Sequence, residues 1–310
     1  MRKLLLLLLF SSVSYCQSYP GSFTRVGLNA EGMALGNAMS ADLSRNVYTF
    51  YNPALASFQS GSDVMASVAL LSLDRQLNSL VYTQSLKPTA GFSLGILNAT
   101  VSNIDGRDYD GAHTSDLSTS ENLFFFGFSN KFSEALSLGL NFKFYYYSLY
   151  SGVSSKSIGF DIGGLFRATD ALSIGLVATD IGESYHWSST SIYGSVDGSD
   201  FITRFPNVIR LAASYQLPLL GSVLSAEYDF APTPLDGLKA GIEVSPIDIL
   251  AIRAGIQSTN EALVGTEITY SFGFGAKIAF LDFSPQVNYA YVIEPFTPYG
   301  IQTLSLDFGF

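Results

Sequence analysis

Apolar residues alternate with small or polar residues through most of the chain after residue 60. In ALSLGLNFKFYYY (135–147) and in ITYSFGFGAKIAF (268–280), large apolar side chains occupy every second position over long runs. The C-terminal stretch TLSLDFGF (303–310) repeats the pattern, with Leu and Phe on one face and Thr, Ser, Asp and Gly on the other. A period of two places one apolar face and one polar face on a β-strand.

The polar face contains few charged residues. Only 14% of the 310 residues are charged, below the roughly 25% of a typical soluble chain, whereas Phe and Tyr number 24 and 18. In a soluble sandwich this face would meet water and carry many Lys and Glu residues. Gly, Ser, Asn and Thr instead suit the lumen of a barrel whose other face meets lipid.

Fourteen alternating runs predict the strands of an all-β, 14-stranded antiparallel transmembrane β-barrel. Bacterial outer-membrane barrels have an even number of strands, and about 9–11 tilted residues suffice to cross the membrane. The predicted strands are 63–73, 75–86, 89–101, 121–132, 135–149, 155–167, 171–180, 206–217, 220–230, 237–246, 249–257, 265–279, 281–292 and 302–310.

The connections predict the orientation of this barrel. They are tight after every even-numbered strand up to the twelfth, and long at 102–120 and 181–205. Outer-membrane barrels have short periplasmic turns and longer extracellular loops. We therefore expect a multi-pass protein of the outer membrane of a Gram-negative bacterium, in contact with its lipid.

The N-terminal residues MRKLLLLLLF predict a secretory signal peptide over 1–16, because the apolar run is too short for a membrane-spanning helix. Cleavage before Gln17 would leave a mature chain without cysteine, which therefore contains no disulfide. The alternative is lipidation of Cys16, for which Tyr15 is a poor match.

Charge and histidine content argue against nucleic acid binding and catalysis. The net charge of −10 lacks the basic surface that nucleic acids require. Both histidines, His113 and His186, fall in the predicted outer loops. We expect neither an enzyme nor a cofactor. The aspartates of DGRDYDGAHTSD (105–116) lack the spacing of a calcium-binding EF-hand loop, which favours a solvated acidic loop over a calcium site.

Residues 17–60 do not alternate and precede the predicted barrel of 61–310. They are rich in Gly, Ala and Asn and contain short helix-compatible stretches. Small residues allow close backbone packing in a narrow space. This favours an N-terminal hatch or plug within the lumen over a periplasmic extension.

Motifs in this segment resemble the N-terminal signature of PorV/PorQ-like proteins, within the FadL-like superfamily of fourteen-stranded barrels with a hatch. They are EGMALGNAMSA (31–41), DLSRN (42–46) and YNPALA (51–56). The hatch motif comprises Tyr51, Asn52, Pro53 and Ala54, followed by Leu55 where the family often has Gly. Asn-Pro predicts a turn, which either leads the hatch into the first strand or holds it in shape.

The alternation also places charged side chains in the lumen. The residues expected there are Lys143, Asp161, Arg210, Glu227, Asp229, Glu243, Arg253, Glu267, Lys277 and Asp307. Unpaired buried charges are costly, so we expect them to pair with one another or with the plug. A conduit for fatty acids would prefer an apolar tract, so this mixed set favours a plugged, protein-binding barrel.

The outer loops and the C-terminus supply candidate partner sites. His186, Trp187 and Tyr193 lie in the loop 181–205, and Trp187 suits either a partner or lipid anchor or a cap over the barrel mouth. The loops 102–120 and 293–301 are further candidates. Phe308 and Phe310 resemble the C-terminal signal read by the barrel-assembly machinery.

The resemblance implies a non-enzymatic component of type IX protein secretion. Such a barrel would bind a large translocon, its cargo or a cell-surface complex through its outer loops. The alternative is a FadL-like transporter that takes hydrophobic small molecules through the barrel wall. A passive porin is disfavoured by the plug-like N-terminal segment.

Overall fold

The computed structural model describes residues 20–44, 48–231, 235–261, 265–278, 285–294, 297 and 299–310. The predicted signal peptide 1–16 with Cys16 lies outside these residues, as do parts of the motif 42–46 and of the loop 293–301. The beginning of the predicted strand 281–292 also lies outside them. Within the described part of the chain, no helix is long and apolar enough to cross a membrane.

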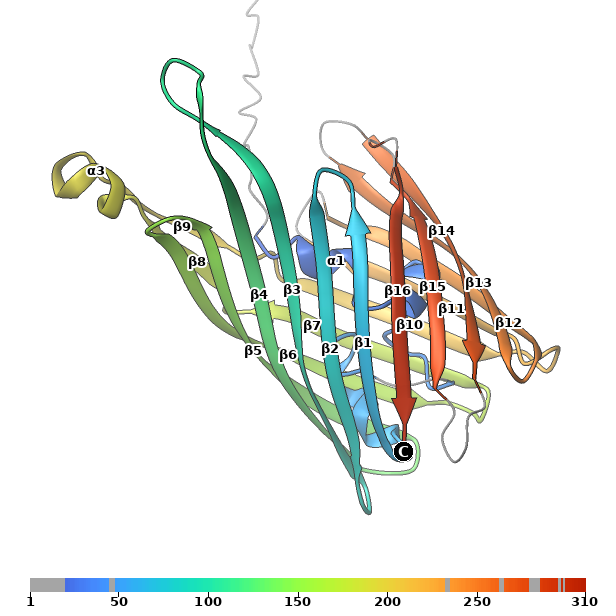
Figure 1. Ribbon diagram of the computed structural model, residues 1–310. Helices are drawn as coiled ribbons and strands as arrows, with labels where there is room; N and C mark the ends of the chain where they lie inside the picture. Colours follow the sequence, from blue (N-terminus) through green and yellow to red (C-terminus); the bar gives the residue numbers. More distant parts are fainter. Residues whose placement is uncertain are drawn as a thin grey trace, which may run out of the picture.

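The described residues form a closed antiparallel barrel of fourteen strands, in which β1 pairs with β16 (Figure 1). This confirms the fold class predicted from the alternation. The barrel strands are β1 (Ser62–Leu71), β2 (Arg75–Leu86), β3 (Ala90–Arg107), β4 (His113–Lys131), β5 (Leu136–Tyr150), β6 (Val153–Arg167), β7 (Leu172–Ile181), β10 (Val208–Gln216), β11 (Val223–Phe230), β12 (Gly237–Ile247), β13 (Leu250–Glu261), β14 (Gly265–Lys277), β15 (Gln286–Ile293) and β16 (Ile301–Gly309).

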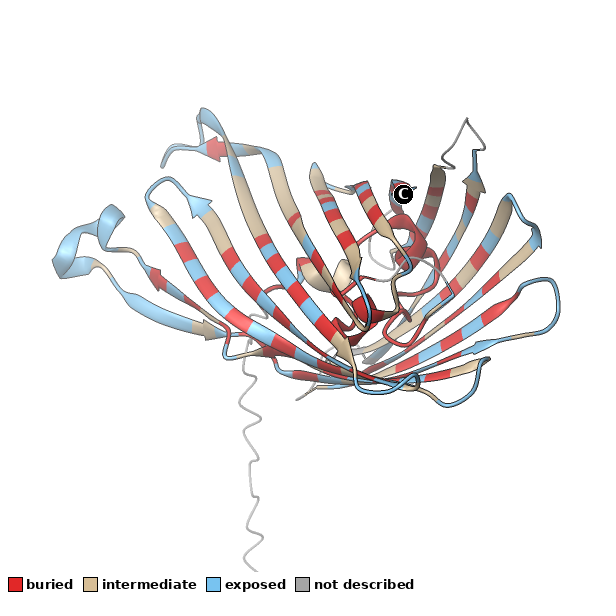
Figure 2. Cartoon of the chain, turned by 90° about the horizontal axis from the view of Figure 1, so that it is seen from below, coloured by how far each residue is buried: buried red, intermediate tan, exposed pale blue. Residues whose placement is uncertain are grey.

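The two faces of each strand differ in burial, as the banding along the strands in Figure 2 shows. On β16, Leu304 and Phe308 are 52% and 38% exposed, whereas Thr303 and Asp307 are 1% and 3% exposed. The outward face is thus a continuous belt of Leu, Ile and Phe around the barrel. An apolar surface of this extent requires lipid around it.

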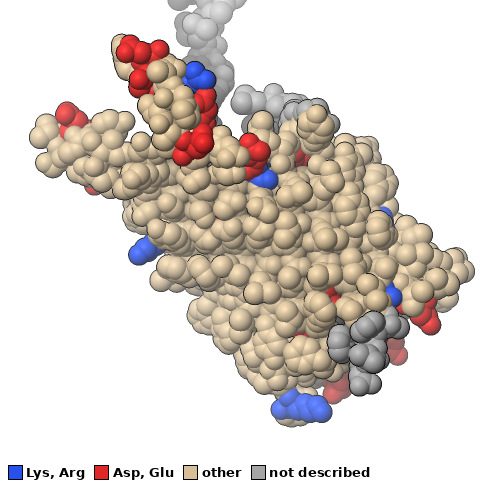
Figure 3. Space-filling model, viewed as in Figure 1, with Lys and Arg blue, Asp and Glu red and all other residues tan. Residues whose placement is uncertain are grey.

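Charged residues on the face seen in Figure 3 gather near the two ends of the barrel, and most of the wall between them is uncharged. One end has the tight turns and Phe310, and the other has the long β3–β4 and β7–β10 connections. We call these the inner and the outer end, by the rule that the longer loops of outer-membrane barrels are extracellular.

The two connections predicted as long loops contain regular structure. Most of 102–120 continues β3 and β4 as a hairpin, with a register shift between Val101 and Ile104. The connection 181–205 contains the two-stranded sheet of β8 (Ser184–Ser188) and β9 (Asp200–Arg204), joined through α3 (Thr190–Asp197). The prediction of loops was wrong here because the strands in these connections contain many polar residues and show no clear alternation of apolar and polar positions.

Residues 20–44 and 48–60, here called the lumenal segment, lie inside the barrel and are mostly buried (Figure 2). They contain α1 (Phe23–Val26), α2 (Ala30–Ala34) and the 3₁₀-helix η1 (Pro53–Phe58). Asn side chains cap two of these turns: Asn29 Oδ1 accepts from Gly32 N, and Asn52 Oδ1 accepts from Ala54 N, both at 3.0 Å. Such caps satisfy backbone N–H groups that a short helix leaves free.

Inward-facing glycines of the wall let the lumenal segment approach closely. A Cβ at Gly139 would meet the backbone of Pro53, one at Gly175 the carbonyl of Ser40, and one at Gly255 the backbone of Gly36. Gly91 lies against Ala56 in the same way. The glycine content of the polar face therefore reflects backbone-to-backbone packing of the segment.

The adjacent glycines Gly163 and Gly164 test this packing. A Cβ at Gly163 would overlap the Asn52 side chain, whereas one at Gly164 would meet nothing closer than Leu138 Cδ2 at 3.4 Å, an ordinary contact. We expect Gly163→Ala to lower the free energy of unfolding by about 1–3 kcal/mol, as overpacking does, and Gly164→Ala to leave it nearly unchanged. Urea unfolding of the two variants in detergent measures both; equal losses would contradict the packing.

Candidate functional site

A cluster of aromatic side chains closes one side of the outer mouth. The ring centroids of Tyr145 and Tyr185 lie 4.8 and 5.0 Å from that of Phe205, and those of Tyr147 and Trp187 are 5.2 Å apart. Tyr185 donates to Glu121 Oε1 at 2.7 Å. This aromatic cap packs onto α1 through Phe23, whose ring lies 6.2 Å from that of Tyr145.

Trp187, for which the sequence left two interpretations open, lies in this cap. The indole is buried and donates through Nε1 to Thr203 Oγ1 at 3.1 Å, so it belongs to the cap. His186 and Tyr193, the other partner-loop candidates, are exposed. The hairpin that carries Trp187 bends over β6, where Ser155 Oγ bonds both the N–H and the carbonyl of His186 at 2.9 Å.

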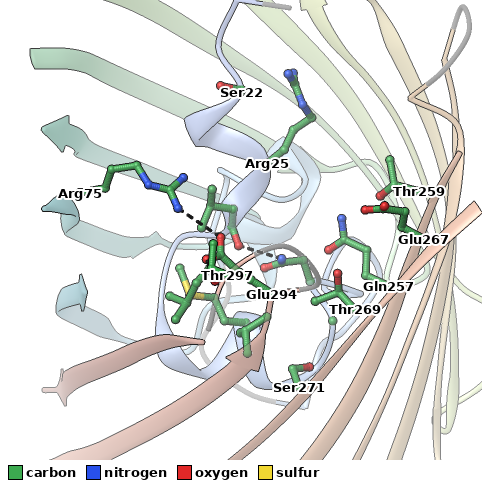
Figure 4. A pocket seen from close by; sticks show the side chains of 16 residues that line it. Ser22, Arg25, Arg75, Gln257, Thr259, Glu267, Thr269, Ser271, Glu294 and Thr297 are labelled. Carbon is green, nitrogen blue, oxygen red and sulfur yellow. Dashed lines mark hydrogen bonds and ion pairs between the residues drawn. The ribbon is translucent and has the colours of Figure 1, made fainter. Parts of the chain in front are cut away.

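On the opposite side of the lumen, an open cavity of about 450 Å³ lies between the lumenal segment and β13–β16 (Figure 4). We call it the outer cavity. Val26, Met33, Val292 and Ile301 give it an apolar part. Polar groups come from β13, β14 and the segment: Ser22, Arg25, Asn37, Gln257, Thr259, Glu267, Thr269 and Ser271. A volume of this size suits a small organic molecule.

Side chains at the rim of the outer cavity connect the first two strands of the barrel to its last two strands. Arg75 Nη2 lies 3.5 Å from Glu294 Oε1, and Ser72 and Thr297 donate to Glu294 Oε2 at 3.1 and 3.0 Å. These contacts hold the connection between β15 and β16 against the start of β2 (Figure 4). The mouth is therefore fixed by side-chain contacts at its edge.

The wall behind the outer cavity is regularly paired. The pairs β13–β14, β14–β15, β15–β16, β16–β1 and β1–β2 have no register shift, and the β14–β15 pairing extends from Tyr270 to Lys277. Register shifts occur in the β3–β4, β5–β6, β6–β7 and β12–β13 pairs. At the depth of Tyr270 and below, the cavity is closed sideways by backbone hydrogen bonds.

Most of the predicted lumenal charges belong to three clusters on the inward side of the strands. In the first, Lys143 Nζ lies 2.7, 2.5 and 3.0 Å from carboxylate oxygens of Asp161, Asp180 and Glu183. These three carboxylates are within 4.8 Å of one another, a spacing that could also hold a metal ion. Here the lysine ammonium lies among them and supplies the compensating cation. Asp180 and Glu183 were not among the predicted residues: strict alternation would point Asp180, the last residue of the predicted strand 171–180, outward, and Glu183 follows that strand.

The second and third clusters connect the wall to the lumenal segment. Lys239 lies 2.8 and 2.7 Å from Glu227 and Asp229, and Arg210 lies 3.8 and 3.5 Å from the same two residues. Glu227 also accepts from Ser40 N at 3.3 Å. The third cluster contains Arg253, whose guanidinium is shared by Glu31, Glu243 and Asn288.

The remaining predicted residues are Asp307, Glu267, Lys277 and those of the hatch motif. Asp307 accepts from Tyr48 Oη at 2.5 Å and from Asn288 Nδ2 at 2.8 Å. Glu267 lines the outer cavity, and Lys277 is exposed near the inner end.

Of the hatch motif, Tyr51 accepts from Leu28 N, and Asn52 donates to Ser40 O at 2.8 Å and to Gly164 O at 3.2 Å. Pro53 and Ala54 begin η1.

Two further groups of predicted residues lie far from the cavity. Phe308 and Phe310 are exposed on the outer surface at the inner end, so their role as an assembly signal stays a prediction. Asp105 contacts His113 and Arg107, and Asp108 Oδ1 accepts from the backbone of Asp110 and Ala112. The carboxylates of Asp105 and Asp108 thus stabilise the tip of the β3–β4 hairpin.

A second cavity, of about 420 Å³, opens near the inner end and is mainly polar. Its lining includes Glu31, Glu243, Arg253, Lys277 and Asp307. We call it the inner cavity. It lies along the same strands as the outer cavity, and α2 borders both, through Met33 on the outer side and Glu31 on the inner side.

Several solved outer-membrane proteins have the same architecture. The toluene transporter TodX of Pseudomonas putida is 14% identical and has a TM-score of 0.61, with 91% of this chain and 96% of that chain covered. CymD, a monoaromatic hydrocarbon channel, is 12% identical with a TM-score of 0.64 over 94% and 99% of the chains. A FadL homologue of Pseudomonas aeruginosa is 12% identical with a TM-score of 0.61 over 91% and 98%.

This chain has the fold of the FadL-like outer-membrane barrels. No family model matches its sequence, and no curated protein resembles it in sequence. The FadL-like part of the predicted resemblance is thus supported at the level of the fold. None of the three structures is a PorV- or PorQ-like protein, so that finer resemblance stays a prediction.

The first charge cluster should make the stability of the protein depend on pH. Burial raises the pKa of the Glu183 carboxyl to about 9. The positive charge of Lys143 lowers this pKa in part, and the negative charge of Asp180 raises it. In the unfolded chain the pKa is about 4.3, so the folded state holds a proton that the unfolded state releases. The free energy of unfolding should therefore fall as the pH rises from about 4.3 to about 9.

Glu183→Gln should make this fall smaller, because the amide has no proton to release. Urea unfolding at pH 5, 7 and 9 measures it, with the fluorescence of Trp187, the only tryptophan, as the probe. The exposed Glu134→Gln is the matched control and should keep the wild-type pH dependence. An unchanged pH dependence in Glu183→Gln would contradict the assignment.

Proposed function

We propose that the protein transports small, largely apolar molecules across the outer membrane. The observation that carries the proposal is the outer cavity, which is open at the extracellular end and has an apolar part beside the lumenal segment. An apolar cavity with a few convergent polar groups is the usual form of a small-molecule site. The neighbours described as a toluene transporter and a monoaromatic hydrocarbon channel support the same class of substrate.

The outer end of the barrel is closed on one side and open on the other, which also supports transport. The aromatic cap blocks the mouth above β4–β6, and the outer cavity leaves an entrance above β13–β16. The lumenal charges are paired among themselves and with the segment, so they do not require a protein partner to neutralise them. A protein-binding barrel was preferred because a conduit would need an apolar tract, and the apolar part of the outer cavity now supplies one.

The role in type IX secretion is the second candidate, and one observation favours it. The β8–α3–β9 unit projects from the outer end (Figure 1) and exposes apolar side chains. Ile192, Tyr193 and Val196 on α3 are 44%, 64% and 90% exposed, and Phe201 and Ile202 on β9 are each 54% exposed. Such a surface suits a protein partner such as a translocon, its cargo or a surface complex.

Two neighbouring positions on β14 test the transport proposal. Thr269 lines the outer cavity, and Tyr270 faces the lipid. Thr269→Trp should fill the cavity and weaken toluene binding by about tenfold or more, which corresponds to a loss of about 1.4 kcal/mol. Tyr270→Trp should bind like the wild type, since it changes only the lipid-facing surface.

Saturation-transfer NMR of toluene with the purified protein in detergent measures binding, and uptake of radiolabelled toluene by cells that express each variant measures transport. We expect both to fall in Thr269→Trp alone. If the wild type neither binds nor takes up toluene or longer apolar molecules such as oleate, the proposal fails. An equal effect of both tryptophans would place the binding site outside the cavity.

A further inference from the structure

Two rows of polar residues cross the outward face of strands β2–β6 toward the outer end of the barrel. The strand register places the following residues side by side in the first row, from β2 to β6: Asn78, Asn98, Asn122, Tyr146 and Lys156. The next row toward the outer end consists of Gln76, Thr100, Ser120, Ser148 and Ser154. We call the two rows the polar strip.

The polar strip faces away from the lumen. Leu97 and Leu123 are buried in the interior of the barrel. Successive side chains of a strand point to opposite faces, so the neighbouring Asn98 and Asn122 point outward. Both asparagines are partly exposed, so their amides can still contact a molecule outside the barrel.

The apolar belt of the barrel ends at the polar strip. The row next to it on the inner side consists of Leu80, Ile96, Phe124, Phe144 and Ile158. On β5 the outward residues are apolar from Leu136 to Phe144, a length that matches the roughly 9–11 residues with which a tilted strand crosses the hydrocarbon. The polar strip therefore lies at the level where the hydrocarbon of the outer leaflet ends.

On β10–β12, by contrast, apolar outward residues continue to the outer ends of the strands. Ile209 at the start of β10 pairs with Phe230 at the end of β11, and each is 51% exposed. Leu238, at the start of β12, is 46% exposed. The polar strip is thus a local feature of β2–β6 and not simply the border of the apolar belt.

The chemistry of the polar strip suits a phosphorylated sugar. Asn98 Nδ2 donates to Asn122 Oδ1 at 2.7 Å and to Ser120 Oγ at 3.1 Å, which holds the amides in a row along the surface. Amides and hydroxyls both donate and accept, as the hydroxyls of a sugar do. Lys156 Nζ lies 5.9 Å from the centroid of the Tyr146 ring and supplies a cation for a phosphate. A face that met only water would carry more charged residues.

We propose that the polar strip binds the headgroup of a glycolipid of the lipopolysaccharide type in the outer leaflet. The amides and hydroxyls bond its sugars, Lys156 pairs with a phosphate, and its acyl chains lie against the apolar row below. The outer leaflet of an outer membrane consists largely of such glycolipid, whose sugars and phosphates lie at the level where the hydrocarbon ends. The site lies on the outer surface of the wall and does not depend on the proposed transport function.

Native mass spectrometry of the purified full-length protein in detergent tests the site. Titration with lipid A that carries its inner-core sugars measures glycolipid binding, and titration with phosphatidylglycerol measures binding of a phospholipid without those sugars. We expect the wild type to bind the glycolipid about tenfold or more tightly than phosphatidylglycerol, because it forms several additional hydrogen bonds.

A double variant with Asn98→Leu and Asn122→Leu replaces two amides of the polar strip by apolar side chains of similar size. It should bind the glycolipid about tenfold more weakly than the wild type, because the hydrogen bonds to its sugars are lost, and bind phosphatidylglycerol unchanged. Asn130→Leu is the matched control. Asn130 lies opposite the outward-facing Leu138 near the inner end of β4, so its loss should leave glycolipid binding unchanged.

Lys156→Gln tests the phosphate contact separately. The wild type should bind dephosphorylated lipid A about threefold more weakly than the phosphorylated form, the size of effect that an exposed ion pair gives. Lys156→Gln should bind the two forms with the same affinity, because it has no cation to distinguish them.

Equal affinity of the wild type for the glycolipid and for phosphatidylglycerol would overturn the site, because the polar strip would then only mark the border of the membrane. Unchanged glycolipid binding in the double variant, or an equal loss in Asn130→Leu, would also overturn it. If the double variant does not assemble into a barrel, the comparison with Lys156→Gln decides. A wild type that does not distinguish the two forms of lipid A then contradicts the proposal.

Discussion

The close packing of the lumenal segment against inward-facing glycines is the contact on which the interior depends. A barrel of fourteen strands is too wide for its own side chains to fill, so its lumen holds either water or a separate piece of chain. Here the wall omits side chains where the segment passes, at Gly139, Gly163, Gly175 and Gly255 among others. Backbone contact then replaces side-chain filling, and the shape of the segment decides which spaces remain open.

Charge pairing completes this arrangement. Each of Lys143, Arg210, Lys239 and Arg253 is within 4.0 Å of carboxylate oxygens, and Glu31 brings one of those carboxylates from the segment itself. Breaking a buried pair by removing one partner typically costs 3–5 kcal/mol. The clusters therefore hold the segment in one position, and the ion pair at α2 is one of the points where the segment and the wall are linked by opposite charges.

Much of this architecture could be predicted from the sequence, because period-two alternation needs only local information. The strands and the inward charges such as Arg253 follow from faces and spacing, whereas only the small residues of the segment and the family resemblance indicate its position in the lumen. The β8–β9 hairpin was missed because its polar residues lack strong alternation, and Trp187 could not be assigned because its ring packs against that of Tyr147, distant in sequence. The cavities could not be predicted either, because they are spaces between the wall and a segment without a repeating pattern.

Whether this barrel works alone or with a large partner is the central question. The measurement that answers it most directly is gentle-detergent purification of the tagged protein from its native outer membrane, with mass spectrometry of both proteins and small molecules. The account predicts a barrel without a stoichiometric protein partner that carries a co-purified apolar small molecule. Stoichiometric recovery of a very large barrel or of a surface-processing complex, without such a ligand, would contradict it.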